Sequence, residues 1–308
     1  MAENLYFNLR DVIGRIVFHG ARTMERLFPP PILRCVFFPI AMALALRDIS
    51  RRRWLEIPFC KLPPNWSVNR TLPLLFNIRS QFHLTRLMAN WPDRFSEPHW
   101  CSRFKIEGME FLEQAMREKR PVILVSAHFG PLFLLRYFLR AMGWPAATFI
   151  GGPASSRPDV RRDKDRLAHF PGLPHVFGPD QSLRDVHRFL QQGNILLMAF
   201  DVPTGERIEV ACDEVKVRFA TGSIRLAAST NARLIPCIIS ECDPWKFIIR
   251  LGQPVPSAML SPCPDREGAA RHIAKECFQS IKASPAECGH ELLDALLLRS
   301  HVLDSVAP

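Results

Sequence analysis

The stretch PVILVSAHFG at residues 121–130 decides the fold class of this 308-residue chain. It opens with an apolar run, PVILVSA, which is typical of a strand buried on both faces. The run ends at His128, and Gly130 follows two residues later. A helical pattern with a glycine stop comes next, at 131–143, and then a short strand pattern at 146–151. This order predicts a unit of strand, helix and strand, which is typical of α/β proteins.

The same alternation continues toward the C-terminus. The expected helices span 106–119, 157–170, 182–193, 222–231 and 267–283, and the expected strands span 194–200, 214–219, 233–239 and 245–252, the last of them antiparallel. Such an order predicts a mostly parallel central sheet flanked by helices, whose ligands lie beyond the carboxyl ends of the strands. His128 stands at such an end and is suited to act as a general base. An isolated histidine there is also often a hydrogen-bonded structural residue.

Composition excludes several classes of protein. With 47% hydrophobic and 23% charged residues, the chain is not globally disordered. Its nine cysteines form no CxxC pair, and we find no cleavable signal, which favours reduced packing thiols in the cytosol over a disulfide or zinc framework. The histidines outside the strand end lack the spacing of metal ligands, so we expect no metal.

The whole chain has a net formal charge of +10, and positive charge is concentrated in its N-terminal third. The arginines there lie among Phe, Leu, Ile and Trp, and this company favours an anionic membrane surface over nucleic acid as the partner. Residues 9–28 have the pattern of a basic amphipathic helix. The apolar run at 35–46, about 18 Å long as a helix and interrupted by Pro39, is too short for a hydrocarbon core of about 30 Å.

We therefore interpret residues 1–60 as a helical, membrane-associating region that lies on the membrane surface, and residues 61–308 as the α/β domain. A peripheral or monotopic attachment fits the short apolar run better than a spanning helix does. The alternative for the N-terminal region is an ordinary packed helical hairpin.

Several segments in a fixed order resemble the lipid A biosynthesis (late) acyltransferases, a branch of the glycerolipid acyltransferase superfamily. These segments are 106–130, the arginine-rich region at 161–166, LLMAFD at 196–201, 215–239 and SPAECGHELL at 284–293. The resemblance covers roughly residues 5–300 and implies a glycerolipid acyltransferase-like fold. It also implies transfer of a fatty acyl chain from acyl carrier protein or coenzyme A to a hydroxyl of a membrane glycolipid. The family works at the cytoplasmic face of the inner membrane and needs no cofactor or metal.

The motif of the family is a histidine, four residues, and then an aspartate or glutamate. The histidine removes the proton of the attacking hydroxyl, and the carboxylate orients the imidazole. His128 matches the motif and Gly130 matches the family's His-x-Gly pattern, but Phe133 stands at the position of the acid. No carboxylate occurs anywhere from 119 to 158.

Three interpretations of this departure stay open. Asp201, which matches an aspartate that the family carries near its site, supports His128 in place of the missing acid. Alternatively, the acceptor is a more reactive group than a sugar hydroxyl, such as an amine or a phenol, so that His128 alone suffices. In the third interpretation the protein is catalytically impaired and serves as a lipid-binding or scaffolding partner.

The resemblance also places phosphate contacts on an arginine-rich helix. Arg161, Arg162 and Arg166 match a region thought to meet phosphate or phosphopantetheine groups, and Arg162 and Arg166 share one helix face. A solvated helix whose arginines pair with neighbouring aspartates is the alternative.

The remaining substrate-binding residues lie on turns and helix starts. Thr221 and Gly222 open a helix whose N–H groups are suited to an anion or to the developing oxyanion, although an ordinary capped helix start has the same pattern. Gly130 and Phe133 complete the expected substrate contacts beside His128.

Overall fold

The computed structural model describes most of the α/β region and one N-terminal helix. The described residues are 30–50, 101–150, 175–178, 182–212, 215–243, 246–260, 265–283, 287–289, 292 and 295–298. Residues 30–50 belong to one compact unit, and the described residues from 101 onward belong to a second. The predicted helices at 9–28 and 157–170 and the predicted boundary at residue 60 lie outside the described residues.

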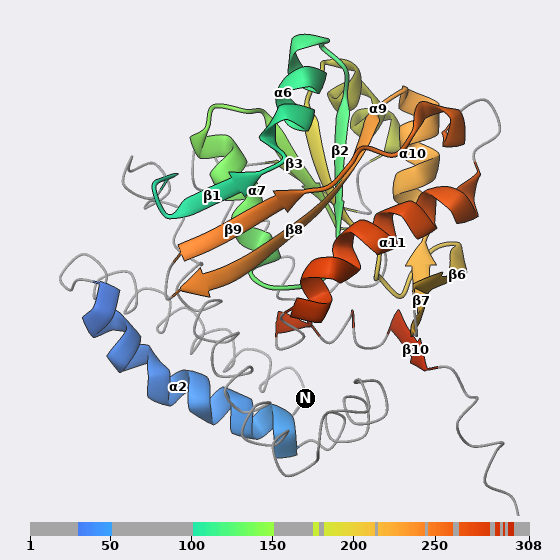
Figure 1. Cartoon of the computed structure of the whole chain (residues 1–308). Coiled ribbons are helices and arrows are strands. Elements are labelled where there is room, and N and C mark those ends of the chain that lie inside the picture. The colour runs from blue at the N-terminus through green and yellow to red at the C-terminus, as the bar shows by residue number, and fades with distance from the viewer. Residues whose placement is uncertain are drawn as a thin grey trace, which may run out of the picture. The chain divides into compact units, whose positions relative to one another are not determined.

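A seven-stranded sheet with the order β1-β9-β8-β2-β5-β3-β4 forms the centre of the second unit (Figure 1). Its neighbouring strands pair in parallel, with the exception of β8 and β9, which are antiparallel. The sheet confirms the predicted fold class and the antiparallel strand. In chain order the strands are β1 (Phe104–Glu107), β2 (Val122–Ser126), β3 (Ala146–Phe149), β4 (His175–Phe177), β5 (Ile195–Ala199), β8 (Arg233–Asp243) and β9 (Lys246–Leu251).

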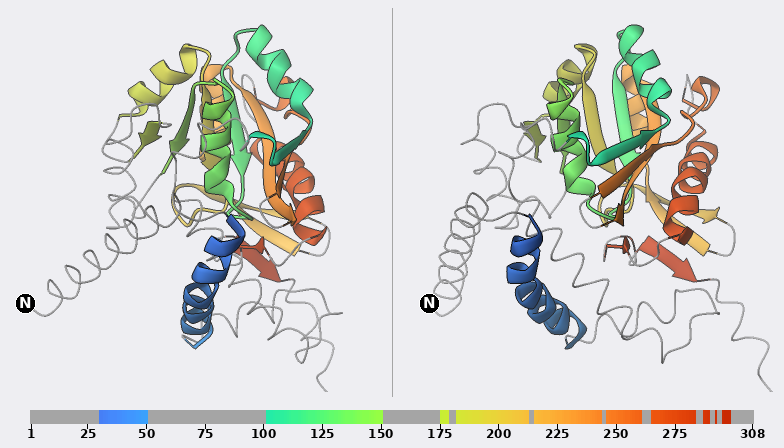
Figure 2. Two further views of the ribbon diagram at one scale, coloured as in Figure 1. Left: turned by 90° about the vertical axis from the view of Figure 1, so that its left-hand side faces the viewer. Right: turned by 60° about the vertical axis from the view of Figure 1, so that its left-hand side comes forward.

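Helices lie on both faces of this sheet, with α7 on one face and α11 on the other (Figure 2). The β2 strand is consequently buried along its whole length, as its continuous apolar sequence predicts. The helices of this unit are α6 (Met109–Arg117), α7 (Leu132–Ala141), α9 (Leu183–Gln191), α10 (Gly222–Thr230) and α11 (Arg266–Ala283), with a short 3₁₀ turn at Ser257–Met259.

The predicted helix at 106–119 begins too early. Residues 104–107 form β1, and the chain turns at Gly108, where φ is +80°, before α6 starts. A Cβ atom at Gly108 would overlap the Leu251 carbonyl oxygen, so the turn and the close approach both require glycine. Phe104 stacks on Phe247 of β9 with ring centroids 5.1 Å apart, and this tertiary contact outweighs the local helical pattern.

A second, three-stranded antiparallel sheet has the order β10-β7-β6. Its strands are β6 (Arg207–Cys212), β7 (Val215–Ala220) and β10 (Leu296–Leu298). The sequence predicts β7, but not β6, β10 or the three-residue β4. The β6 strand exposes Arg207, Glu209 and Ala211, so it lacks the apolar run that signals a buried strand.

In the first unit, α2 (Pro30–Ser50) is one continuous helix that contains Pro39. The predicted interruption at Pro39 is therefore wrong. The helix exposes the large apolar side chains of Ile32, Val36, Phe38, Ile40 and Leu46. No helix in the described part of the chain combines the length and the apolar character that crossing a membrane requires.

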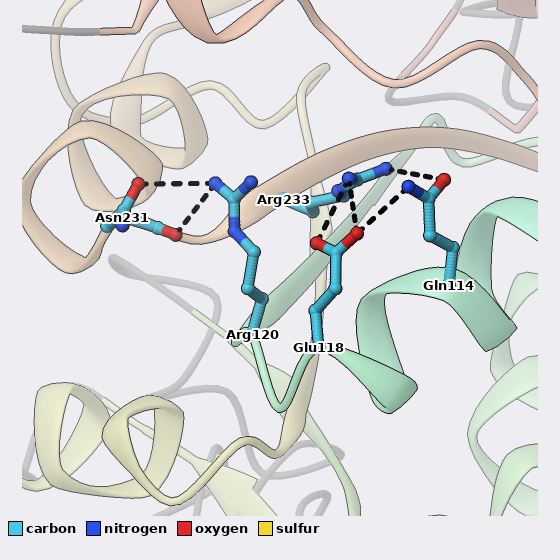
Figure 3. A network of polar contacts seen from close by, with 5 residues as sticks. All are labelled: Gln114, Glu118, Arg120, Asn231 and Arg233. Carbon is cyan, nitrogen blue, oxygen red and sulfur yellow. Dashed lines mark hydrogen bonds and ion pairs between the residues drawn. The ribbon is translucent and has the colours of Figure 1, made fainter.

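A polar network ties together the amino ends of β2 and β8 (Figure 3). Arg233 donates to Glu118 Oε2 at 3.1 Å and to Gln114 Oε1 at 3.2 Å. Arg120 donates to Asn231 Oδ1 at 3.2 Å, and Asn231 ends α10 in the left-handed conformation with φ +51°. These contacts fix the end of the sheet opposite to His128.

Candidate active site

The order of the strands places a topological switch point at the carboxyl ends of β2 and β5. From β2 the chain passes through α7 to β3, which lies on the far side of β5. From β5 it passes through the small sheet and α10 to β8, which lies on the far side of β2. Neighbouring strands whose connections run in opposite directions form the ligand-binding switch point of open α/β sheets. The strands are in register, with Ser126 opposite Ala199. His128 and Asp201, each two residues beyond its strand, therefore lie side by side.

Asp201 contacts His128 through both of its carboxylate oxygens. The backbone N–H of His128 donates to Oδ2 at 2.7 Å, and Nδ1 of the imidazole lies 2.8 Å from Oδ1. The Asp201 side chain is completely buried, whereas the His128 side chain is 35% exposed. One carboxylate thus fixes both the backbone and the ring of His128.

This arrangement determines which ring nitrogen is basic. A carboxylate accepts hydrogen bonds, so Nδ1 carries the proton that faces Asp201. The lone pair of the neutral imidazole then lies on Nε2, the nitrogen that can take a proton from an incoming group. A buried carboxylate behind the ring also stabilises the imidazolium ion once it forms.

The turn after β2 uses its backbone N–H groups internally. Phe129 donates to the Ala127 carbonyl oxygen at 2.8 Å, and Gly130 donates to the Glu287 carbonyl oxygen at 2.8 Å. Gly130 has φ +54°, and a Cβ atom there would overlap the Ile239 carbonyl oxygen. The glycine is thus required by the backbone. Its N–H is bound within the protein, so the expected contact of Gly130 with substrate does not involve this group.

The C-terminal segment 287–289 contacts the His128 turn, a contact that no pattern in the sequence predicts. Gly289 N–H donates to the His128 carbonyl oxygen at 2.6 Å, and Cys288 forms an antiparallel bridge with Phe129. The Glu287 carboxylate accepts the backbone N–H of Glu241 at 3.0 Å. The segment lies within the stretch 284–293 that carries the family resemblance, but its composition gives no sign that it reaches the turn.

Thr221 and Gly222 stand at the start of α10 near Asp201, because Ala220 N–H donates to the Phe200 carbonyl oxygen at 2.7 Å. The hydroxyl and the N–H of Thr221 both donate to the carbonyl oxygen of Glu206. Thr221 is thus fully buried and structural, and its N–H does not serve an anion. Gly222 is exposed and remains the candidate at this helix start.

Phe133 is the second residue of α7, directly after the turn. The three arginines expected to bind phosphate, Arg161, Arg162 and Arg166, lie outside the described residues. The structure thus brings together His128, Asp201 and the start of α10, and it leaves the arginine cluster a prediction.

Two buried cysteines of the central sheet and α11, Cys237 and Cys277, do not act as nucleophiles. None of the seven cysteines in the described ranges forms a disulfide. Burial raises the pKa of the Cys237 thiol to about 12 and raises that of Cys277 well above its usual value. Both thiols are therefore protonated at neutral pH and act as packing groups.

Comparison with known proteins identifies the family. No curated protein matches the chain. The family model for the bacterial lipid A biosynthesis acyltransferases matches residues 24–288, which is most of its length. The chain therefore belongs to the bacterial lipid A biosynthesis acyltransferase family.

Proposed function

We propose that this chain is a membrane-associated acyltransferase in which His128 is the general base and Asp201 is its carboxylate partner. The observation that carries the proposal is the double contact of Asp201 with the backbone N–H and Nδ1 of His128. Asp201 occupies the role that the motif acid has in the family, and Phe133 at the motif position is then no obstacle to catalysis. Family membership supports the class of reaction.

The reaction follows from this geometry. Nε2 of His128 takes the proton of the acceptor hydroxyl, or of an amine, while the acceptor atom bonds to the carbonyl carbon of an acyl thioester. Negative charge moves to the former carbonyl oxygen. The carbon–sulfur bond then breaks, and the leaving thiolate takes the proton from the imidazolium ion. The products are an ester or amide and a thiol, and His128 returns to its neutral form.

The developing oxyanion needs donors from outside the His128 turn. The N–H groups of His128, Phe129 and Gly130 are bound to Asp201, Ala127 and Glu287. We propose that the backbone at Gly222, at the amino end of α10, faces this charge, since the first N–H groups of a helix are directed outward and favour an anion.

Donor and acceptor are proposed from the family. The donor is a fatty acyl thioester of acyl carrier protein or coenzyme A, and the acceptor is a glycolipid or another lipid-like molecule. Arg161, Arg162 and Arg166 are the proposed contacts for the phosphate of the donor or the acceptor, because guanidinium groups bind phosphate in a bidentate manner. Phe133 is proposed to contact the acyl chain.

We propose attachment to the cytoplasmic face of the inner membrane, in a peripheral or monotopic manner. The exposed apolar side chains of α2 support this attachment, because residues such as Phe38 and Leu46 lose unfavourable contact with water when they enter the acyl-chain boundary. Arginines that surround the apolar run favour anionic headgroups.

The test is acyl transfer by the purified full chain in micelles that contain anionic phospholipid. Radiolabelled acyl thioesters of acyl carrier protein and of coenzyme A are offered in parallel, each with a glycolipid, an amine and a phenol as acceptors. His128→Gln is the matched variant, because glutamine keeps hydrogen-bonding groups but cannot accept the proton. We expect label on an acceptor with the wild-type chain and only background with His128→Gln. Equal transfer by both proteins, or intact thioester in every reaction of the wild type, contradicts the proposal.

The second candidate function is a non-catalytic lipid-binding or scaffolding partner, which Phe133 at the motif position favours. This function predicts that the wild-type chain binds vesicles and thioester but transfers nothing. Binding without turnover across the acceptor panel replaces the first proposal with this one.

Restoring the motif acid separates the two functions further. We expect Phe133→Glu to lower kcat/KM by about tenfold, because Nδ1 already has its carboxylate and a second charge replaces an apolar contact with the acyl chain. Phe133→Leu, which keeps the position apolar, should lose less. Measured in the same transfer assay, a gain of activity in Phe133→Glu contradicts the role proposed for Asp201.

A further inference from the structure

Residues 287–289 bind both ends of the turn that carries His128. The Glu287 carbonyl oxygen accepts the N–H of Gly130 at 2.8 Å, and Gly289 N–H donates to the His128 carbonyl oxygen at 2.6 Å. Cys288 pairs with Phe129 between these two bonds. His128 is thus held by two separate contacts, by Asp201 and by a segment from the far end of the chain.

The side chain of Glu287 anchors this segment to the central sheet. Its Oε2 accepts the backbone N–H of Glu241 in β8 at 3.0 Å, while its own carbonyl oxygen holds Gly130. The carboxyl group also lies against Gly130, because a Cβ atom built there would be 2.9 Å from Oε2. A single residue therefore links a strand of the sheet to the His128 turn.

We propose that Glu287 is a positioning residue for His128, and that its anchor on β8 keeps Nε2 directed toward the acceptor. This inference rests on the proposed role of His128 as the base. Without the anchor, segment 287–289 moves away from the turn and the Gly130 N–H loses its acceptor. Asp201 still binds the ring, but the ring no longer meets the acceptor at the reacting distance, and small displacements of a catalytic group have large effects on rate.

The charge state of Glu287 makes this anchor sensitive to pH. Burial is the main cause that raises the pKa of Glu287 from 4.5 to about 7, and the nearby Glu241 carboxylate adds to it. The hydrogen bond from the Glu241 N–H and the charge of Arg250 act in the opposite direction. The titratable or charged side chains on the elements beside Glu287 include Glu241 of β8, Arg250 of β9 and His128 of the turn.

The direction of the pH effect follows from linkage. The Glu287 carboxyl holds its proton more tightly in the folded chain than in the unfolded chain. The protonated group therefore stabilises the fold fully below pH 4.5, and this contribution to the stability is lost as the pH rises through about 7. The anchored position of segment 287–289 therefore becomes less stable relative to a released one at alkaline pH, because the buried Glu287 carboxyl is then ionised. Replacement of the carboxyl by a neutral amide removes this weakening.

The test uses Glu287→Ala and Glu287→Gln in the full chain, with two readouts. Hydrogen exchange reports the Gly130 amide, and steady-state kinetics give kcat and KM at about pH 6 and about pH 8.5. We expect Glu287→Ala to speed exchange of the Gly130 amide at least about tenfold and to lower kcat about tenfold with little change in KM. Glu287→Gln should restore protection of the amide, and its kcat relative to wild type should rise between the two pH values.

Two further variants keep the test specific. Glu276→Ala is the matched control. Glu276 accepts the backbone N–H of Gln253 at 3.2 Å, so its substitution removes a similar side-chain anchor that does not contact the His128 turn. Gly289→Ala directs a Cβ atom to within 2.5 Å of the His128 carbonyl oxygen and 3.0 Å of its Cβ, and should also lower kcat with KM retained.

The outcomes separate this inference from the proposed function. Unchanged exchange of the Gly130 amide in Glu287→Ala overturns the inference, and so does an equal loss of kcat in Glu276→Ala or a pH profile of Glu287→Gln that coincides with wild type. Because amide exchange needs no turnover, it tests the anchor even if the wild-type chain transfers no acyl group, a result that counts against the proposed function alone.

Discussion

Replacement of Asp201 by asparagine should lower kcat by about 10³–10⁴-fold, as the corresponding change does in catalytic triads. Both carboxylate oxygens of Asp201 accept hydrogen bonds, one from the His128 backbone N–H and one from Nδ1. Asparagine has a single acceptor oxygen, so its amide nitrogen must face one of these two donors. The variant either loses the hydrogen bond from the His128 backbone N–H or forces the imidazole into the other tautomer. In that tautomer Nε2 carries the proton and cannot act as a base.

Coupling between the two residues provides the stricter measurement. His128→Ala should cause a loss of similar size, and the double variant should be hardly slower than His128→Ala alone, because residues that act as a unit are not additive. Single-turnover acyl transfer measures all three variants. Glu118→Gln is the control, since it removes a carboxylate that contacts Arg233 at the opposite end of the sheet. Additive losses from His128 and Asp201 contradict a shared role.

The second large effect is on stability. Gly130→Ala should destabilise the fold by about 3 kcal/mol or more, because alanine is strained at φ +54° and its Cβ overlaps the Ile239 carbonyl oxygen. Relief of the overlap moves the turn away from β8, so that the bond from Gly130 to Glu287 breaks and His128 is displaced. Thermal denaturation in one detergent, together with the transfer assay, measures both consequences.

Gly143→Ala separates the overlap from the backbone strain. Gly143 has φ +79°, and a Cβ atom there meets nothing within 4 Å. Its substitution should therefore cost only the backbone term, about 1 kcal/mol, and should leave acyl transfer unaffected. Equal destabilisation by the two substitutions contradicts the packing described at Gly130.

The core of the site is visible in the sequence because two apolar strands end in polar residues. PVILVSA runs into His128, and the apolar stretch before Asp201 ends in the same way. Carboxyl ends of parallel strands meet at one edge, so the two residues are expected near each other. Their contact additionally depends on the register of β2 with β5, which only the packed sheet determines.

Other parts of the site and fold are set by tertiary contacts that leave no local signal. Glu287 reaches the turn from a segment without strand or helix periodicity, and nothing in its neighbours indicates that its carboxyl meets β8. The local pattern predicts the start of a helix where β1 lies, because only the pairing of β1 with β9 decides its conformation. The sequence pattern at Thr221 predicts either an anion contact or an ordinary helix start, and the Glu206 carbonyl oxygen takes both of its donors.

The wide spacing of these contacts along the chain sets the order in which the site forms during translation. A nascent chain emerges from the ribosome with its N-terminal part first, so β2 and β5 can pair, and His128 can meet Asp201, before residues 287–289 have been made. At that stage the His128 turn lacks the bonds to Glu287 and Gly289. We expect a ribosome-bound or prematurely terminated chain to carry a misaligned histidine, so that acyl transfer starts only after synthesis has passed residue 289.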